Sequence, residues 1–256
     1  MDRQTLLSEL RDALPIQVER ARLAPGNVGL VVVDVVRGFT REGNLSDAAS
    51  MAPMVAAVDG VIRELQAKLA ARLRLLMLRD THHADIPESP YPPHCIKGSG
   101  EDELDPDLAW AAHLPGAVVL DKDCINGFVG AMEPCGHGVW RNRLCDWVAE
   151  HELTTLVLVG DCTDICVSDL AVALLSARNH GMLHAAGPED REAYVASITG
   201  LQIMVHAGAT ATFDLDPDEP FARGQETLRH PGPLAHHVGL WVAASRGARV
   251  ISGFDW

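Results

Sequence analysis

Cys166 is the first candidate for chemistry in this 256-residue chain. It lies in the segment VLVGDCTDICV (157–167), where a β-branched run meets a glycine and a short polar turn before a helical pattern begins. Unpaired backbone N–H groups at such a helix start favour a thiolate and can also bind an oxyanion. A lone cysteine is more often a buried structural residue. Other reactive residues at equivalent positions favour a nucleophile here.

Three charged residues follow other apolar runs in the same way. Asp34 ends the run 28–34, Asp80 follows 73–79, and Lys122 follows 117–121. Singly, each is as readily a helix cap, a turn residue or a surface lysine. Ligands of open parallel sheets bind beyond the carboxyl ends of the strands, where these residues and Cys166 would meet. A lysine that lowers the thiol pKa and a carboxylate that takes and returns its proton suit amide hydrolysis through a thioester.

A second group has the composition of a metal site. Asp80, His82 and His94 supply one carboxylate and two imidazoles, a set typical of Zn or Fe(II) sites that keep positions open. Glu88 or a water completes the sphere, and the sequence leaves this choice open. His83 is expected to point elsewhere, and the pair at 236–237 is expected to serve packing or the surface.

The elements that must position these residues follow a βα pattern. Short apolar runs alternate with helix-period segments, which indicates an α/β fold with a doubly wound, six-stranded, mainly parallel sheet and helices on both faces, a Rossmann-like three-layer arrangement. We expect a single domain over residues 1–256. The predicted strands are 28–34, 73–79, 117–121, 154–160, 201–206 and 248–252. The predicted helices are 3–13, 48–70, 136–151, 166–180, 219–229 and 233–246.

Composition excludes some partners. The net charge of −14 leaves no basic stripe for nucleic acid or an anionic membrane, and no run approaches the roughly 20 apolar residues of a membrane span. Six cysteines without a CxxC pair indicate free thiols in a reducing compartment, and we expect a cytoplasmic protein. The proline-rich segment 81–116 is too long for a simple connection and is expected to be functional.

These motifs together resemble the nicotinamidases, most of all the plant type, within the isochorismatase-like cysteine hydrolase superfamily. The resemblance covers about residues 28–252. The matching segments are VVVDVVRGFT (31–40), RDTHHADIPESPYPPHCIKGSGEDEL (79–104), DKDCINGFVGAME (121–133), VGDCTDICVSDLAVALLSARNHG (159–181) and HPGPLAHHVGLWVAASRGARVIS (230–252).

The resemblance implies an amidohydrolase that converts nicotinamide to nicotinate and ammonia in NAD salvage. It implies that Cys166 is the nucleophile, Asp34 the proton acceptor and donor, and Lys122 the stabiliser of the thiolate. It also implies a cis peptide at Asp161–Cys162 and an oxyanion hole from the backbone N–H groups of Cys162 and Cys166.

The remaining roles concern the substrate. By resemblance, Asp80, His82 and His94 hold one divalent metal ion per subunit, most often zinc, with iron or manganese as alternatives, and the metal binds the pyridine nitrogen. Phe39 and Tyr91 correspond to aromatic residues around the substrate. Many relatives have tryptophan instead of Tyr91, which leaves substrate preference open.

The expected domain includes an N-terminal helical extension at 1–25. A probable insertion at 183–200 departs from the family pattern. Two other functions compete with the first. One is a cysteine hydrolase of the same superfamily for another small amide, of the carbamoyl or maleamate type. The other is a non-catalytic binding protein of this fold, although Asp34, Lys122 and Cys166 are all present. Members often form homo-oligomers, but the sequence does not determine the assembly.

Overall fold

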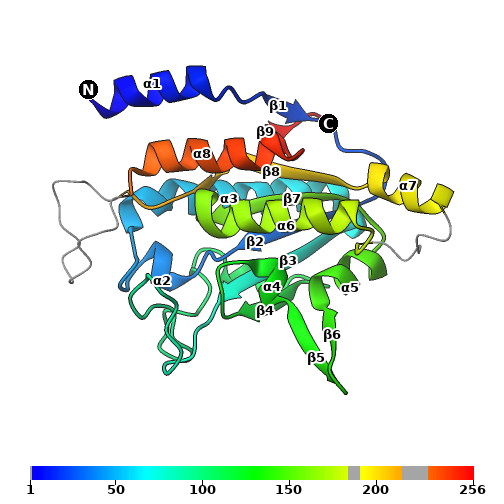
Figure 1. The fold of residues 1–256 in the computed structure, drawn as a ribbon, viewed down its shortest axis with the longest axis horizontal. Coiled ribbons are helices and arrows are strands. Elements are labelled where there is room, and N and C mark those ends of the chain that lie inside the picture. Colours follow the sequence, from blue (N-terminus) through cyan, green and yellow to red (C-terminus); the bar gives the residue numbers. More distant parts are fainter. Residues whose placement is uncertain (1, 184–190, 215–229) are drawn as a thin grey trace.

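Seven strands form one parallel sheet with helices on both faces (Figure 1). The structure is a computed structural model that describes residues 2–183, 191–214 and 230–256. The strand order is β1-β9-β8-β7-β2-β3-β4. The strands of this sheet are β1 (Val18–Ala21), β2 (Asn27–Val33), β3 (Leu73–Asp80), β4 (Val118–Lys122), β7 (Leu153–Asp161), β8 (Gln202–Ala211) and β9 (Arg249–Phe254).

The centre of the sheet is apolar along almost its whole length. β2 and β7 are neighbours, and nearly every residue of both is buried. Strands covered on both faces have continuous rather than alternating apolar sequences, which is why VGLVVV and LVLVG are so easily recognised as strands. The pairing of β2 with β7 ends at Val33 and Gly160, and that of β3 with β4 ends at Asp80 and Lys122. The parallel register therefore brings the predicted reactive residues to one edge.

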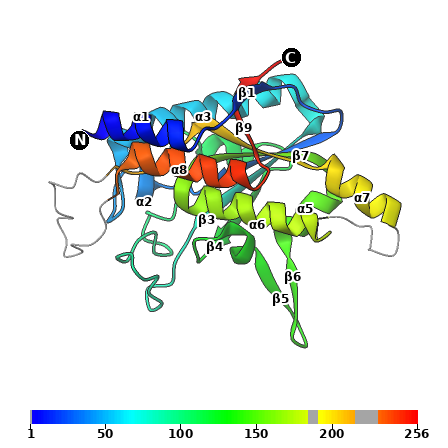
Figure 2. The same ribbon diagram turned by 45° about the horizontal axis from the view of Figure 1, so that its top comes forward.

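Helices cover the two faces unequally (Figure 2). The long helix α3 packs its apolar stripe against one face, and α5, α6 and α8 pack against the other. The described helices are α1 (Arg3–Ala13), α2 (Arg37–Thr40), α3 (Ala48–Leu69), α4 (Gly127–Gly130), α5 (Arg143–Glu150), α6 (Ser168–Asn179), α7 (Arg191–Gly200) and α8 (Gly232–Ser245). Three short turns complete them: η1 (Ala70–Arg72), η2 (Ala109–His113) and the π-helical turn η3 (Thr163–Val167). The predicted doubly wound fold is confirmed.

The predicted strand count is wrong by one, because the segment predicted as a helical extension also contains β1. This strand has only four residues, too few for a periodic signal, and it pairs in parallel with β9. The strand predicted at 201–206 continues to Ala211 as β8. A register shift opposite β7 interrupts its pattern there, so the sequence AGATA did not look like a strand.

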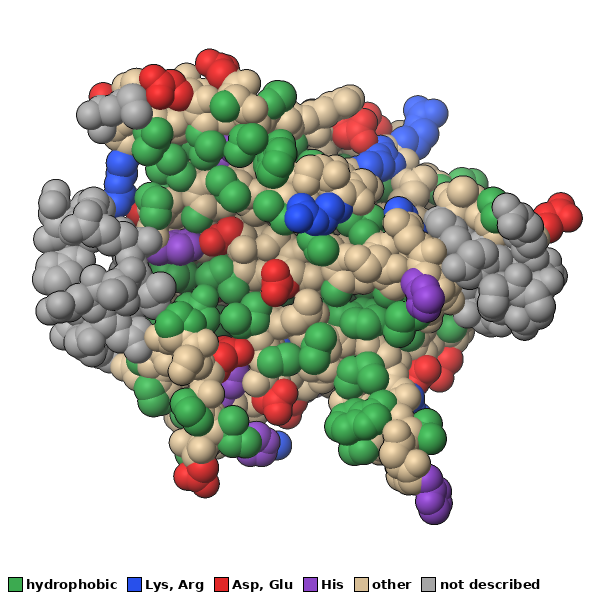
Figure 3. Space-filling model, in the orientation of Figure 1, with side chains coloured by type: hydrophobic (Ala, Val, Ile, Leu, Met, Phe, Trp, Pro, Cys, Tyr) green, Lys and Arg blue, Asp and Glu red, His purple; other side chains and the backbone are tan. Residues whose placement is uncertain are grey.

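The helix predicted at 136–151 begins late, because residues before it form a hairpin of β5 (Met132–Gly136) and β6 (Val139–Asn142). The helix α5 starts only at Arg143, where the side chain of Asn142 accepts hydrogen bonds from the first N–H groups. The hairpin projects from the body (Figure 1) and has apolar side chains on its surface (Figure 3), including Val139 and Trp140.

The other predicted helices agree with α1, α3, α6 and α8 to within two residues. The helix predicted at 219–229 lies outside the described residues. Of the probable insertion at 183–200, the structure describes Leu183 and α7. No helix in the described ranges has both the length and the apolar character needed to cross a membrane.

Candidate active site

Lys122 joins two carboxylates at the carboxyl edge of the sheet. It ends β4, while Asp80 ends the neighbouring β3 and Asp34 follows β2, the next strand along. Lys122 Nζ lies 2.9 Å from Asp34 Oδ2 and 2.7 Å from Asp80 Oδ1. All three side chains are buried. The predicted meeting of these residues follows directly from the strand order.

Cys166 reaches the same lysine from β7. The chain leaves β7 through a cis peptide between Asp161 and Cys162, as the family resemblance predicted, and then forms η3. Cys166 Sγ lies 4.0 Å from Lys122 Nζ. The helix α8 supports this turn from behind: a Cβ at Gly239 would lie only 2.5 Å from the backbone of Asp164, so only glycine allows this contact.

The charges of this group favour a protonated thiol at rest. Burial lowers the pKa of Lys122, but Asp34, Cys166 and Asp80 together raise it well above its usual value, so the lysine stays cationic. Burial raises the pKa of Cys166, and Lys122 lowers it less than burial and the carboxylates raise it. Burial also raises the pKa of Asp34, to about 7. The Asp34 carboxylate is therefore basic enough to exchange a proton with the Cys166 thiol near neutral pH.

Asp80, His82 and His94 form a compact set of potential metal ligands. One ligand atom from each lies within 4.8 Å of the others, and all three residues are buried. Asp80 Oδ2 is 3.0 Å from His82 Nε2 and 3.3 Å from His94 Nε2. The structure thus brings together the three residues that the sequence spacing singled out.

The details of this set fit a divalent cation. His94 Nδ1 is 2.8 Å from the carbonyl oxygen of Pro92, which leaves Nε2 as the ring nitrogen that faces the set. Burial raises the pKa of Asp80, but Lys122 and the two histidines outweigh it and keep this carboxylate ionised. Glu88 Oε2 lies 3.5 Å from His82 Nε2 and 3.6 Å from His94 Nε2, and Glu88 Oε1 accepts a hydrogen bond from Ile125 N–H. Glu88 is therefore placed to join a cation held there.

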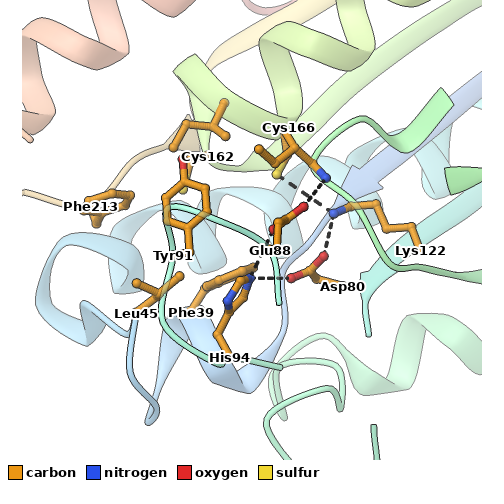
Figure 4. Close-up of a pocket in the computed structure, with 12 residues that line it drawn as sticks. Phe39, Leu45, Asp80, Glu88, Tyr91, His94, Lys122, Cys162, Cys166 and Phe213 are labelled. Atoms are coloured by element: carbon orange, nitrogen blue, oxygen red, sulfur yellow. Dashed lines mark hydrogen bonds and ion pairs between the residues drawn. The ribbon is translucent and has the colours of Figure 1, made fainter. Parts of the chain in front are cut away.

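One pocket connects the two groups (Figure 4). It is a narrow hollow, partly open to solvent, with Cys166, Lys122 and Asp80 at one side. Phe39 and Tyr91 line it, as the resemblance predicted, and both rings lie within about 6 Å of the His94 ring. A pocket with aromatic walls and its reactive groups at one side suits a flat ring that carries one reactive polar substituent.

The sequence did not single out several lining residues: Leu45, Ile125, Ile165 and Phe213. Phe213 follows β8, so the rule that ligands bind beyond strand ends would have found it if this strand had been predicted at its full length. Ile125 and Ile165 lie in the family-matched segments 121–133 and 159–181, but nothing in their residue type distinguishes them from core residues.

Comparison with known proteins decides the family. The profile of the Isochorismatase domain matches residues 28–187. The chain is also 40% identical to Nicotinamidase 1 of Arabidopsis thaliana, over 97% of this chain and 96% of that relative. The chain belongs to the isochorismatase family. The segment that matches the family profile contains both the lysine-centred group and the metal-ligand set, whereas Phe213 lies beyond it.

Solved structures show the same fold as this isochorismatase-family chain. The pyrazinamidase/nicotinamidase of Streptococcus mutans UA159 superposes with a TM-score of 0.58 at 21% identity, over 88% of this chain and 100% of that one. The pyrazinamidase of Pyrococcus horikoshii in complex with zinc gives a TM-score of 0.57 at 19% identity, over 88% and 98%. At such identities the likeness concerns the fold.

Proposed function

We propose that this protein is a nicotinamidase, a cysteine amidohydrolase that converts nicotinamide to nicotinate and ammonia. The observation that carries the proposal is the position of Lys122, whose ammonium contacts Asp34, Asp80 and Cys166 and so joins a nucleophilic thiol to a metal-ligand set within one aromatic-walled pocket. The Arabidopsis relative, which matches along nearly the whole chain, carries the name nicotinamidase.

Asp34 acts first as the base. Oδ2 of its carboxylate pairs with Lys122, whereas Oδ1 has no hydrogen-bond partner within the described part of the chain and can take a proton. With a pKa raised to about 7, it can take the Cys166 proton and later give it back at neutral pH. Lys122 stays cationic and stabilises the thiolate during this transfer.

The thiolate of Cys166 then attacks the carboxamide carbon and forms a tetrahedral oxyanion. The backbone N–H groups of Cys162 and Cys166 are the proposed donors to this oxyanion, because η3 begins between them at the end of β7. Asp34 returns the proton to the nitrogen, the C–N bond breaks, and ammonia leaves a thioester. Asp34 next takes a proton from water, whose oxygen attacks the thioester, releases nicotinate and restores the thiol.

Asp80, His82 and His94 are the proposed ligands of one divalent cation, with Glu88 or a water completing the sphere. When bound, such a cation supplies a Lewis acid for a pyridine nitrogen and so orients the ring. Zinc is the expected ion, because the set has typical zinc ligands and the Pyrococcus horikoshii pyrazinamidase is named in complex with zinc. Iron and manganese remain the alternatives, and elemental measurement of the purified protein distinguishes the three.

The test is ammonia release from nicotinamide, measured beside carbamoyl and maleamate-type amides. We expect nicotinamide to have the highest kcat/KM and the Cys166→Ala variant to release no ammonia from it. A higher kcat/KM for a non-aromatic amide would replace nicotinamide as the substrate and retain the cysteine mechanism. Ammonia release by Cys166→Ala would exclude that mechanism.

The cellular setting is also part of the proposal. All six cysteines are free, which suits a single-domain enzyme of the reducing cytoplasm. The substrate is a small molecule, and self-association of the chain remains to be measured by sedimentation.

A further inference from the structure

His230 contacts two acceptor groups at once, beyond the family-matched segment. Its Nε2 lies 2.8 Å from Asp164 Oδ2, and its Nδ1 lies 2.7 Å from the carbonyl oxygen of Phe213. A carboxylate and a carbonyl have no proton to donate, so both ring nitrogens must carry one. The pair of contacts therefore requires the imidazolium form of His230.

The same ring also stacks on Phe213. The two ring centroids are 3.9 Å apart, with an angle of 23° between the planes. A cation over an aromatic face gains electrostatic attraction in addition to packing. The His230 ring thus contacts both the main-chain carbonyl and the aromatic ring of Phe213.

Phe213 and Asp164 belong to different parts of the site. Phe213 lines the pocket on the side opposite Lys122 and Asp80, with Tyr91 between them in the view (Figure 4). Asp164 lies in η3, two residues before Cys166, and the close contact of Gly239 with its backbone fixes that turn. Asp164 therefore has a fixed position, and its contact with His230 fixes in turn the position of Phe213 at the far wall of the pocket.

The geometry points to His230 as a positioning residue that, in its protonated form, holds Phe213 as the far wall of the substrate pocket and so limits the size of the amide that fits. This inference rests on the proposed function for its choice of substrates. His230 does not touch the reacting atoms, and it acts on the substrate through Phe213, which it joins to Asp164.

The charges around His230 agree with this role. Burial lowers its pKa, but Asp164 and the Phe213 carbonyl raise it above the usual value, and Asp214 raises it further. The other groups near it are Asp161, which is largely uncharged at neutral pH because its pKa is raised to about 8, and Arg3, which pairs with Asp214. On α8, His236 bonds to Thr163 and has a lowered pKa, so it adds no charge at neutral pH.

The sign of the pH effect follows from the raised pKa. The imidazolium contacts are complete at acidic pH and are lost as the pH rises through the pKa of His230 in the folded protein. We therefore expect KM for nicotinamide to rise over that range, by about tenfold for the loss of one charged hydrogen bond. The value of kcat should depend on pH in the same way in wild type and in variants of His230, because His230 does not contact Cys166.

The first experiment combines two substitutions. His230→Gln should raise KM at neutral pH about tenfold, remove the rise of KM with pH, and increase kcat/KM for amides with bulkier rings relative to nicotinamide. Phe213→Ala should show the same change in size preference. In the double variant, the His230 substitution should add little, because its effect passes through Phe213. Additive effects on KM would overturn the inference.

The matched control is His237→Gln. His237 lies on α8 and also contacts a backbone carbonyl, that of Leu14, but it does not line the pocket. Glutamine can donate the same hydrogen bond, so KM and its pH dependence should stay as in wild type. A similar loss of substrate affinity in this variant would show that any disturbance of α8 has the effect.

The second experiment needs no known substrate. NMR spectra of the wild-type protein with isotope-labelled histidine report the protonation of each ring nitrogen. We expect the His230 signal, assigned by its loss from the spectrum of His230→Gln, to show both nitrogens protonated at neutral pH and a pKa above the usual value of a histidine. If the His230 signal lacks these properties, the inference is wrong. If wild type releases no ammonia from nicotinamide but this histidine is observed, the proposed function fails and the contact itself stands.

Discussion

Asp161 ends β7 with a carboxyl group that is fully buried and has no hydrogen-bond partner in the described part of the chain. Burial raises its pKa from 3.8 to about 8, and the neighbouring Asp34 and Asp164 raise it too, against the smaller opposing effects of Cys162 and His230. The folded protein therefore holds a proton on Asp161 at neutral pH that the unfolded chain releases.

This difference makes stability depend on pH. Because its pKa is raised in the folded state, ionisation of Asp161 does not affect the unfolding free energy below about pH 4. Between about pH 4 and pH 8 it lowers the unfolding free energy increasingly. Each pH unit in that window costs about 1.4 kcal/mol, so the loss at pH 7 is roughly 4 kcal/mol at most. Asp161→Asn removes the ionisation and keeps the shape of the side chain, so it should remove this pH dependence.

The assay is urea unfolding of wild type and Asp161→Asn at several pH values. The unfolding free energy of the variant should increase relative to wild type as the pH rises from about 4 to 8. The asparagine amide also lacks a partner, which costs roughly 1–3 kcal/mol at every pH, so the slope and not the offset is the test. Asp12→Asn, which removes an exposed carboxylate from α1, is the control. Parallel profiles for wild type and Asp161→Asn would refute the argument.

Four further substitutions test the site. Cys166→Ala should keep the circular dichroism spectrum and the metal content of wild type and lose thioester formation, as seen by mass spectrometry of substrate-treated protein. His94→Ala and Asp80→Ala should lose bound metal in elemental measurements and therefore have a lower Tm. The fall in Tm should be larger for Asp80→Ala, because Lys122 then also loses one of its two carboxylate partners. Lys122→Met should move alkylation of Cys166 to higher pH, and its unfolding free energy should fall by about 3–5 kcal/mol because two buried carboxylates lose their cation.

The sequence predicted the part of the site that depends on strand ends. Asp34, Asp80 and Lys122 each follow a strongly apolar run, and parallel pairing of adjacent strands leaves them no other place than one edge. The ligand set was predictable for a similar reason, because Asp80 and His82 are separated by one residue and a proline-rich loop returns His94 to them.

The remainder depends on contacts between distant segments. Phe213 meets His230 only through tertiary packing, and neither residue type implies the other. The net effect on the Cys166 thiol could not be predicted either. Lys122 does lower the pKa of Cys166, as the sequence predicts, but burial and the neighbouring Asp34 and Asp80 raise this pKa more. Burial and the number of neighbouring charges are properties of the folded protein.

The strand β1 has a consequence for how the protein is made. It is an edge strand, and its neighbour in the sheet is β9, the last strand of the chain. Residues 18–21 therefore leave the ribosome long before their partners at 249–254 exist, and this edge can form only after residues 249–254 have been made. Just beyond β9, Trp256 donates a hydrogen bond to Glu64 on α3 and so ties this edge of the sheet to the helix. A chain that lacked residues 249–254 would leave β1 without the strand it pairs with.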